Sequence, residues 1–377
     1  MLFISIALLA FYVILISYFF IGWMLVVARK NNPFANNEPG ATGFSIVISV
    51  RNEEQNIEAC LQSISQQKYP NELFEIIVID DGSTDKTADI IHTFINQSRS
   101  IGTTFNIHYV KSDLKNKKAA ITMGISDAQH DYIVLTDADC TRNENWLSAI
   151  NRFVKQSKCK MIYAPVRFKA QNIFEKMQAL EFAGLVGIGA ASMELKNPNM
   201  CSAANLIFEK KVFNEVNGYQ DNMHLLSGDD EFLMHKIFKL YPDKVKFLLN
   251  YDAMVTTTAS SSVEELAEQR KRWVSKATKY ENRYITLILI LAYLFNASIF
   301  INFVWGFFDE FYFKLSLSQL LIKMIIEFAF LSQVARHLKQ FHLIKYLILA
   351  EPLHVIYVLF VGIAGSFGSF EWKGRVG

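Results

Sequence analysis

Apolar segments alternate with amphipathic segments through the middle of the chain. Four short apolar runs have the length of β-strands and cover residues 44–50, 74–80, 105–110 and 131–137. Helical patterns follow the first three runs at residues 52–67, 87–97 and 117–128. In the first of these, Ile57, Leu61 and Ile64 fall on one helical face, and Asn52 and Gln55 have the spacing of a capping box. Strands that alternate with helices predict an α/β fold, in which a mostly parallel sheet carries helices on both faces.

The alternation is less regular after residue 139. Residues 160–168 predict one more strand, and residues 172–195 form a strongly apolar helical segment rich in Gly and Ala. Such a helix suits the membrane surface or the membrane interior. A helix buried in a protein core has the same character, so the sequence leaves both placements open.

Long uncharged segments lie towards both ends of the chain. Residues 2–28 carry no charge, and at about 1.5 Å per residue they would reach roughly 40 Å as a helix, enough to cross a bilayer. The segment has neither the basic n-region nor the cleavage site of a signal peptide, so we expect a retained anchor. Three further apolar segments, at residues 285–308, 315–335 and 346–365, are expected to cross the membrane.

These patterns divide the chain into three expected parts. Residues 1–30 form a transmembrane anchor, residues 43–280 an α/β domain, and residues 284–368 about three transmembrane helices. Arg29 and Lys30 follow the first span, which places that end of the helix, and the domain after it, in the cytoplasm at the inner membrane.

The charge rule gives no consistent answer at the C-terminus. With four spans, the terminal segment "EWKGRVG" would lie outside the cell although it contains Lys373 and Arg375. Either the rule fails at this end, or one apolar segment does not cross the membrane.

Composition and charge narrow the possible partners. Hydrophobic residues make up 51% of the chain and include 31 Phe, and their concentration in the end segments points to membrane lipids as surroundings. A net charge of +2 gives no indication of a nucleic-acid partner. The cysteines at positions 60, 140, 159 and 201 have the spacing of neither a zinc motif nor a disulfide framework, so we expect reduced thiols.

Two aspartates follow the fourth predicted strand in the segment "VLTDADCTRN". In a strand, residues i and i+2 point the same way, so Asp137 and Asp139 could converge on one point. Two like charges this close favour a cation between them, and Mg²⁺ or Mn²⁺ prefers oxygen ligands. The alternative is that both are ordinary turn residues at a strand end.

A second acidic pair follows the strand at residues 74–80. In "VIDDGSTDKT", Asp80 and Asp81 precede Gly82, which permits a tight turn. The two carboxylates could hold a ribose or the N–H edge of a nucleobase, because both offer hydrogen-bond donors. A plain strand-turn-helix connection has the same composition. Ligands of such sheets bind beyond the carboxyl ends of the strands, where both acidic pairs are expected.

A third acidic group lies in "LLSGDDEF". Ser227 and Asp230 have the spacing of a capping box, so Asp230 could simply be a carboxylate that starts a helix. A helix N-terminus also keeps a carboxylate ionised, which a general base at neutral pH requires.

A basic cluster precedes the apolar segment at residues 285–308. It comprises Arg270, Lys271, Arg272, Lys276, Lys279 and Arg283. For most of these side chains the positive-inside rule is a sufficient explanation. Arg272 differs, because on a helix it shares a face with Gln269 and Trp273. An arginine fork could bind a diphosphate, and the indole could cover a sugar ring.

Together these motifs resemble the family 2 glycosyltransferases, inverting enzymes with a GT-A fold that use nucleotide-diphosphate sugars. The similarity is greatest to the membrane-anchored branch that contains ceramide glucosyltransferase-like and cellulose- or hyaluronan-synthase-like proteins. Six motifs match in order between residues 43 and 280: "SVRNEE" (49–54), "VIDDGSTDKT" (78–87), "NKKAA" (116–120), "DAD" (137–139), "GDD" (228–230) and "QRKRW" (269–273).

The resemblance implies a role for each matching residue. Ser49, Glu53, Asp80 and Asp81 fall where the family holds the nucleoside. Lys118 matches the lysine of a Gly-Lys pair, with Lys117 in place of the usual glycine. Asp137 and Asp139 match the D-x-D motif, whose second aspartate binds Mg²⁺ or Mn²⁺. Asp230 matches the base that deprotonates the acceptor, and Asp229 stands where glutamate is commoner. Gln269, Arg272 and Trp273 match the Q-x-x-R-W segment that closes over the diphosphate and the acceptor.

The chemistry that the resemblance implies is a single inverting displacement. A cation and an arginine would stabilise the charge that develops on the leaving diphosphate, and one base would activate a hydroxyl of the acceptor. Because four spans are few for a polysaccharide channel, we expect transfer of one sugar, with a UDP-sugar as donor, to a lipid-borne acceptor. The alternatives are a processive polysaccharide synthase and a non-catalytic membrane scaffold with a degenerate transferase domain.

Overall fold

The computed structural model describes residues 1–31, 40–100, 106–114, 116–225, 227–276, 279–280, 282–367, 371–373 and 375–376. The chain forms two compact units. The helical unit contains residues 1–24, 170–191 and 259–377, and the sheet unit contains residues 25–169 and 192–258.

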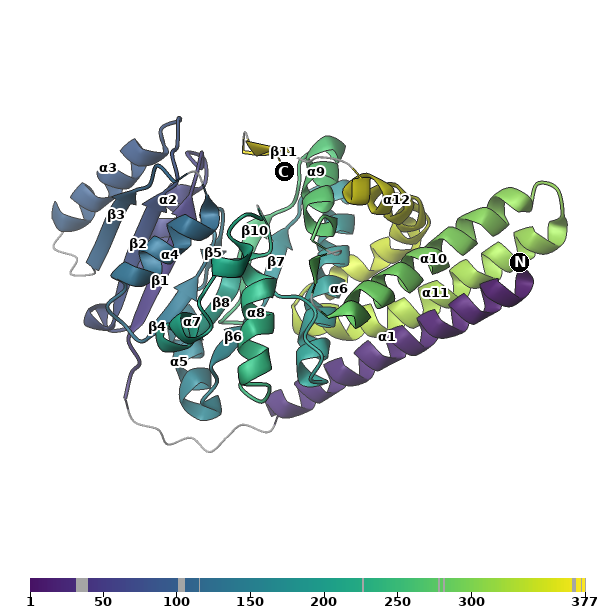
Figure 1. Ribbon diagram of the computed structural model, residues 1–377, viewed down its shortest axis with the longest axis horizontal. Coiled ribbons are helices and arrows are strands. Elements are labelled where there is room, and N and C mark those ends of the chain that lie inside the picture. Colours follow the sequence, from purple (N-terminus) through teal and green to yellow (C-terminus); the bar gives the residue numbers. More distant parts are fainter. Residues whose placement is uncertain are drawn as a thin grey trace. The chain divides into compact units, whose positions relative to one another are not determined.

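The sheet unit is built on a seven-stranded sheet with the strand order β3-β2-β1-β4-β8-β6-β9 (Figure 1). Neighbours among β1, β2, β3 and β4 pair in parallel, and β8 is antiparallel to both β4 and β6. The α/β fold with a mostly parallel sheet is therefore confirmed. The strands are β1 (Phe44–Val50), β2 (Phe74–Asp80), β3 (Asn106–Lys111), β4 (Tyr132–Leu135), β6 (Met161–Tyr163), β8 (Leu206–Glu209) and β9 (Val245–Phe247).

The strands near the centre follow the predictions most closely. β1 and β2 have the predicted bounds, because their side chains are almost all buried, as expected for strands covered on both faces. β3 begins at Asn106, and the predicted first residue, Phe105, lies outside the described residues. β4 ends at Leu135, two residues before the predicted end at Asp137.

The single strand expected over residues 160–168 is wrong. Two strands, β6 and β7 (Val166–Lys169), flank Pro165 and belong to different sheets. Proline has no N–H to donate, so a ladder is interrupted there. β7 lies with β5 (Thr141–Arg142) and β10 (Val255–Thr258) in a small sheet of order β5-β10-β7.

Helices cover the faces of the large sheet (Figure 1). Those of the sheet unit are α2 (Ile57–Ser65), α3 (Thr87–Ser100), α4 (Lys117–Asp127), α5 (Trp146–Ser157), α7 (Lys210–Glu215) and α8 (Asp229–Leu240), with short 3₁₀ turns η1 (Asn71–Leu73), η2 (Ala203–Asn205) and η3 (Gln220–Asn222). The capping box expected at Asn52 and Gln55 is wrong. The N-cap of α2 is Asn56, and its side chain makes no capping hydrogen bond.

The helical unit contains most of α1 (Leu2–Asn31) and α6 (Ile173–Glu194), together with the elements that follow residue 259. These elements are α9 (Val263–Val274), α10 (Arg283–Trp305), α11 (Glu310–His337), η5 (Phe341–Tyr346), α12 (Leu347–Phe367), β11 (Glu371–Trp372) and β12 (Arg375–Val376).

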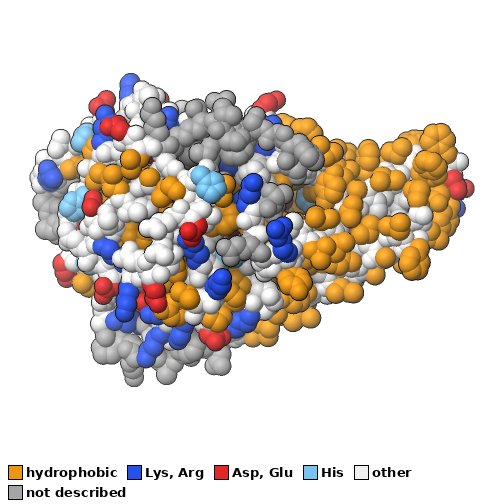
Figure 2. Space-filling view, in the orientation of Figure 1, with side chains coloured by type: hydrophobic (Ala, Val, Ile, Leu, Met, Phe, Trp, Pro, Cys, Tyr) orange, Lys and Arg blue, Asp and Glu red, His pale blue; other side chains and the backbone are white. Residues whose placement is uncertain are grey.

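Four helices among the described residues are long and apolar enough to cross a membrane, over Leu2–Lys30, Arg283–Trp305, Glu310–His337 and Phe341–Gly365. They coincide with the four apolar segments that the sequence singles out. Hydrophobic side chains cover the visible face of the bundle of α1, α10 and α11 (Figure 2). The helix expected over residues 172–195 is α6, and most of its side chains are buried, as in the core-helix alternative.

Candidate active site

The acidic pair after β2 lies at the carboxyl end of the sheet. Asp80 is the last residue of β2 and pairs in register with Val50 at the end of β1. Its Oδ1 accepts a hydrogen bond from the Ser83 N–H (2.8 Å), and its Oδ2 accepts one from the Tyr109 hydroxyl (2.9 Å). The Asp81 carboxylate accepts a hydrogen bond from the Asn116 N–H (3.2 Å). Both aspartates are buried, so the surrounding protein fixes the orientation of both carboxylates.

Ser49 and Glu53 lie at the adjacent end of β1. Ser49 is a half-buried residue of β1 and pairs in register with Ile79 of β2. Glu53 follows the strand; its N–H donates to the Thr87 hydroxyl (2.8 Å), and its carboxylate accepts from the Asn56 amide (2.7 Å). These contacts place both residues at the same edge of the sheet as Asp80.

The D-x-D aspartates lie in a turn and not in a strand. β4 ends at Leu135, and the Cys140 N–H donates to the Asp137 carbonyl (3.3 Å), which closes the turn. Our strand-based reason for their convergence is therefore wrong. The Asp139 carboxylate accepts a hydrogen bond from the Thr257 hydroxyl of β10 (2.8 Å) and lies 3.4 Å from the Cys140 thiol. Burial and the negative charge of Asp137 raise the pKa of Asp139, and a bound cation would relieve both effects.

The two lysines of "NKKAA" have different environments. The Lys118 ammonium is buried and donates to the carbonyls of Asn222 (2.7 Å), Leu225 (2.9 Å) and Ser227 (3.0 Å). Lys118 therefore holds the segment that leads into α8, and three carbonyls accept hydrogen bonds from its ammonium group. The Lys117 ammonium lies instead 3.0 Å from Asp137 and 3.4 Å from Asp229.

Asp230 lies in the first turn of α8. The N-cap of this helix is Gly228, with a left-handed φ of 82° and no capping hydrogen bond from a side chain, so the expected capping box from Ser227 is wrong. The Asp230 carboxylate accepts hydrogen bonds from the Ala203 N–H (3.2 Å) and the Glu231 N–H (2.8 Å). Three acidic residues start this helix, and the partial positive charge of its N-terminus favours their ionised form.

The remaining predicted residues belong to the helical unit. Gln269, Arg272 and Trp273 lie on α9, and all three are half-buried. The centroid of the Trp273 ring lies 6.1 Å from the centroid of the Phe182 ring and 4.2 Å from the guanidinium carbon of Arg270. The sequence pattern gave Arg270 no role beyond the positive-inside rule, but in the structure it is the buried member of the basic cluster.

In the sheet unit, the sequence pattern gave no role to Lys117, Asn116 or Thr257. The Asn116 side chain caps α4 by accepting from the N–H groups of Lys118 and Ala119, and its amide donates to the Met223 carbonyl (2.9 Å). Asparagine directly before a helical pattern is a signal for such a cap. Thr257 lies far from Asp139 in the sequence, and no local pattern indicates their hydrogen bond.

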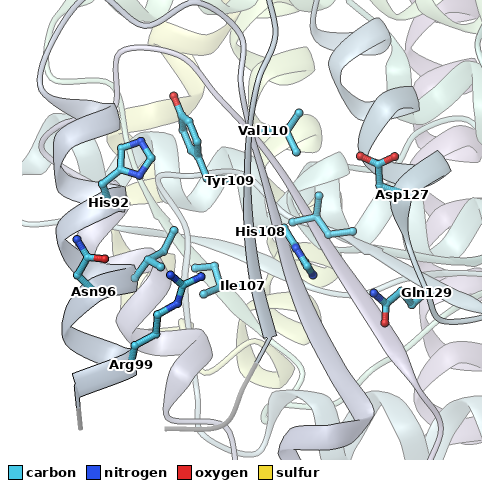
Figure 3. A pocket seen from close by; sticks show the side chains of 11 residues that line it. His92, Asn96, Arg99, Ile107, His108, Tyr109, Val110, Asp127 and Gln129 are labelled. Carbon is cyan, nitrogen blue, oxygen red and sulfur yellow. The ribbon is translucent and has the colours of Figure 1, made fainter. Parts of the chain in front are cut away.

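A cavity of about 620 Å³ lies elsewhere in the sheet unit, around the edge strand β3. His92, Asn96 and Arg99 of α3 lie on one side of the strand, and His108, Asp127 and Gln129 on the other (Figure 3). None of the residues that line it is a predicted site residue. The cavity therefore does not coincide with the acidic rim.

The acidic rim fits a cation that shares its ligands with a substrate. Among the described residues, no three or more His, Cys, Asp or Glu side chains gather into a ready metal site. Mg²⁺ needs no such group, because proteins often hold it with one or two carboxylates together with substrate phosphates. Asp139 and Asp137 supply carboxylates of this kind.

The fold and the rim define a class: an α/β protein whose carboxylates gather at the strand ends where such sheets bind nucleotides. Comparison with known families agrees. Residues 45–216 match the model for glycosyl transferase family 2, and residues 132–363, more than half of the chain, match the model for glycosyl transferase family group 2. The chain therefore belongs to the family 2 glycosyltransferases.

Two curated relatives resemble parts of the chain. Poly-beta-1,6-N-acetyl-D-glucosamine synthase of Staphylococcus epidermidis is 26% identical over 276 residues, which cover 70% of this chain and 63% of the relative. Glycosyltransferase AglE of Haloferax volcanii is 24% identical over 195 residues, which cover 49% of this chain and 58% of the relative. The chain thus matches less than two thirds of the length of either relative.

Among solved structures, the mannosyltransferase PcManGT from Pyrobaculum calidifontis has a similar fold. That structure contains GDP-Man and Mn²⁺. The alignment covers 93% of this chain and 99% of the other with a TM-score of 0.51 and 15% sequence identity. The likeness supports the GT-A fold that the motifs imply.

Proposed function

We propose that the protein transfers a sugar from a nucleotide-diphosphate sugar, with UDP-sugar as the expected donor, to a hydroxyl group of a lipid-borne acceptor. One observation carries the proposal. The sheet unit gathers two pairs of aspartates, a lysine between carboxylates and a helix-start aspartate at one edge of the sheet. This set contains the groups that a metal-assisted single displacement requires.

In this proposal, one group of residues binds the nucleoside of the donor and another acts on its diphosphate. Ser49, Glu53, Asp80 and Asp81 contact the nucleoside, for which the fixed carboxylates of Asp80 and Asp81 are suitable acceptors. Lys117 takes the place of Lys118 as the lysine directed at the diphosphate, because the Lys118 ammonium is occupied by three carbonyls. Gln269, Arg272 and Trp273 of α9 act on the diphosphate and the acceptor, as in the family motif.

The chemical step needs one base in the chain. Asp230 accepts the proton of the acceptor hydroxyl while the hydroxyl oxygen forms a bond to the anomeric carbon. The bond from that carbon to the diphosphate breaks on the opposite face, so the anomeric centre inverts. Mg²⁺ or Mn²⁺ held by Asp139 and Asp137 would neutralise charge on the leaving diphosphate. Arg272 supplies a second positive charge there.

The membrane helices support the choice of acceptor. We propose that residues 43–280 form the transferase domain, that residues 1–30 and 284–368 anchor it in the inner membrane, and that the domain faces the cytoplasm, where sugar nucleotides are made. Membrane spans in the same chain would hold the domain at the membrane, where lipid-borne hydroxyl groups are present. The ceramide glucosyltransferase-like branch of the family is consistent with this acceptor.

A processive polysaccharide synthase is the second candidate. It is favoured by the similarity to poly-beta-1,6-N-acetyl-D-glucosamine synthase. The two candidates differ in the length of their products, so incubating protein-containing membranes with labelled sugar nucleotides separates them. One added hexose per lipid, detected by mass spectrometry, supports the first candidate. A ladder of longer products supports the second, and no transfer with any sugar nucleotide contradicts both.

The role of Arg272 can be separated from that of its basic neighbours. Lysine cannot reproduce the two parallel hydrogen bonds that an arginine fork makes to a diphosphate. Arg272→Lys is therefore expected to lose at least about 1.5 kcal/mol of transition-state stabilisation, or about tenfold in turnover. Lys271 lies about 100° away around the helix, and its ammonium pairs with Glu268 of α9 at 2.6 Å.

Lys271→Ala is accordingly the matched control and should change turnover by less than about twofold. The measurement is turnover of both variants at equal protein levels in membranes. Equal losses at positions 271 and 272 would show that the cluster serves only as a membrane anchor.

A further inference from the structure

Arg270 is the buried arginine of the Q-x-x-R-W helix. In the sequence it lies between Gln269 and Arg272, for which we propose a role in the reaction. Only 3% of its surface is exposed. Each of the three guanidinium nitrogens donates a hydrogen bond. Nε donates to the Tyr357 hydroxyl (2.7 Å), one terminal nitrogen donates to Gln269 Oε1 (2.9 Å), and the other to Glu181 (2.8 Å).

The same guanidinium lies against Trp273. The distance from its carbon to the centroid of the ring is 4.2 Å, a cation–π geometry. Gln269 and Trp273, two of the three motif residues, therefore both touch Arg270. The position of this side chain affects where the motif residues lie.

The partners of Arg270 fasten α9 to two other helices. Glu181 belongs to α6 and Tyr357 to α12. Burial opposes the ionisation of Glu181, but the Arg270 guanidinium and other neighbours hold its pKa below the usual value, so the pair is ionic. Buried charges require such pairing, because an unpaired partner would be costly.

Both anchoring helices are themselves packed closely. A Cβ added at Gly187 of α6 would lie 2.6 Å from Val334 of α11, and one added at Gly365 of α12 would lie 2.8 Å from Val274 of α9. Side chains larger than hydrogen would separate these helices. The close approaches fix the distance of α6 from α11 and of α12 from α9.

A buried charge cluster also joins α12 to α11. The Lys323 ammonium of α11 is fully buried and pairs with Glu327 at 2.7 Å and with Glu351 of α12. The Tyr12 hydroxyl of α1 donates to Glu327. Glu351 and Tyr357 belong to the same helix, so α12 is held both to Lys323 of α11 and to Arg270 of α9.

We propose that Arg270 is a positioning residue, which orients Gln269, Arg272 and Trp273 for the reaction by tying α9 to α6 and α12 through Glu181 and Tyr357. The inference rests on the proposed function of the Q-x-x-R-W helix. It adds a residue whose effect on the reaction is exerted through its neighbours, and it makes the packing of the membrane-spanning helices a determinant of turnover.

Arg270→Lys tests the proposal. Lysine keeps the charge but cannot donate hydrogen bonds to Tyr357, Gln269 and Glu181 in the same geometry. We therefore expect turnover per folded protein to fall by about tenfold to a hundredfold. The KM for the sugar nucleotide should change by a smaller factor than turnover does, because the nucleoside is held by residues outside α9. Tyr357→Phe, which removes one acceptor without changing the packing volume, should lower turnover in the same direction by a smaller factor.

A double variant separates positioning from a purely structural role. If Arg270 acts through its neighbours on α9, Arg270→Lys combined with Arg272→Lys should lose less than the product of the two single losses. Folded protein is quantified by gel filtration in detergent, and Lys271→Ala serves as the control. Unchanged turnover per folded protein in Arg270→Lys, or fully multiplicative losses, would overturn the proposal. Full activity of Arg272→Lys would instead contradict the proposed function of α9.

Discussion

Asp230→Asn is expected to bind the sugar nucleotide almost as well as the unmodified protein and to lose about 10²–10⁴-fold in turnover, the usual cost of removing a general base. The Ala203 and Glu231 N–H groups bond to different oxygens of the Asp230 carboxylate, and asparagine has one oxygen that can accept one of these two hydrogen bonds. It cannot take a proton from an acceptor hydroxyl. Binding by calorimetry and turnover with a labelled donor measure the two properties separately.

The same substitution distinguishes the general base from a helix-start carboxylate. If the side chain only stabilised α8, Asp230→Asn would remove a charge that the helix N-terminus favours by about 0.3–1 kcal/mol, and turnover per folded protein would change little. Asp221→Asn provides the control. Asp221 is an exposed carboxylate that pairs with Lys236 of α8 at 2.7 Å, and its loss should change turnover by less than about twofold. Near-normal rates for Asp230→Asn would remove Asp230 from the mechanism.

Removal of divalent cations is expected to abolish transfer, and addition of Mg²⁺ or Mn²⁺ to restore it. A divalent cation contributes several kcal/mol at a leaving phosphate, which corresponds to a loss on the order of 10³-fold. Asp139→Asn should show a similar loss at ordinary cation concentrations. The amide oxygen can still accept the hydrogen bond from Thr257, so the turn should keep its shape while the charge is lost.

Binding of Mn²⁺, followed by electron paramagnetic resonance in the presence of UDP, provides a readout that is independent of turnover. The signal of bound Mn²⁺ should weaken in Asp139→Asn. It should remain in Asp243→Asn, a variant of an exposed carboxylate that pairs with Lys196. Full activity of metal-stripped protein, or unchanged Mn²⁺ binding by Asp139→Asn, would contradict the role of this aspartate.

Much of the fold follows from local sequence alone. The bounds of β1 and β2 could be predicted because strands buried on both faces are continuous apolar runs. The four long helices could be predicted because a bilayer requires about 20 consecutive apolar residues. The predicted strand boundaries were wrong where the cause was not local. Pro165 divides an apolar run between two sheets, and its carbonyl accepts a hydrogen bond from the Val255 N–H.

The candidate site could be predicted as a set of residues but not as a geometry. Order and spacing of the motifs identified Asp80, Asp81, Asp137, Asp139 and Asp230, and in the structure these residues lie at or just beyond element ends of the sheet unit. The roles that we propose for them still depend on the experiments above.

The sequence by itself determined the class of fold, the apolar helices and the family, because these depend on periodicity, length and motif order along the chain. Only the tertiary structure decided which of two nearby basic residues is buried. Lys117 and Lys118 are chemically alike, and so are Arg270 and Arg272. On a helix the first pair differs by about 100° in direction and the second pair by about 200°. The carbonyls that surround Lys118 and the carboxylate of Glu181 that meets Arg270 come from distant segments. Tertiary packing brings these segments to Lys118 and Arg270, and a local sequence pattern does not encode that packing.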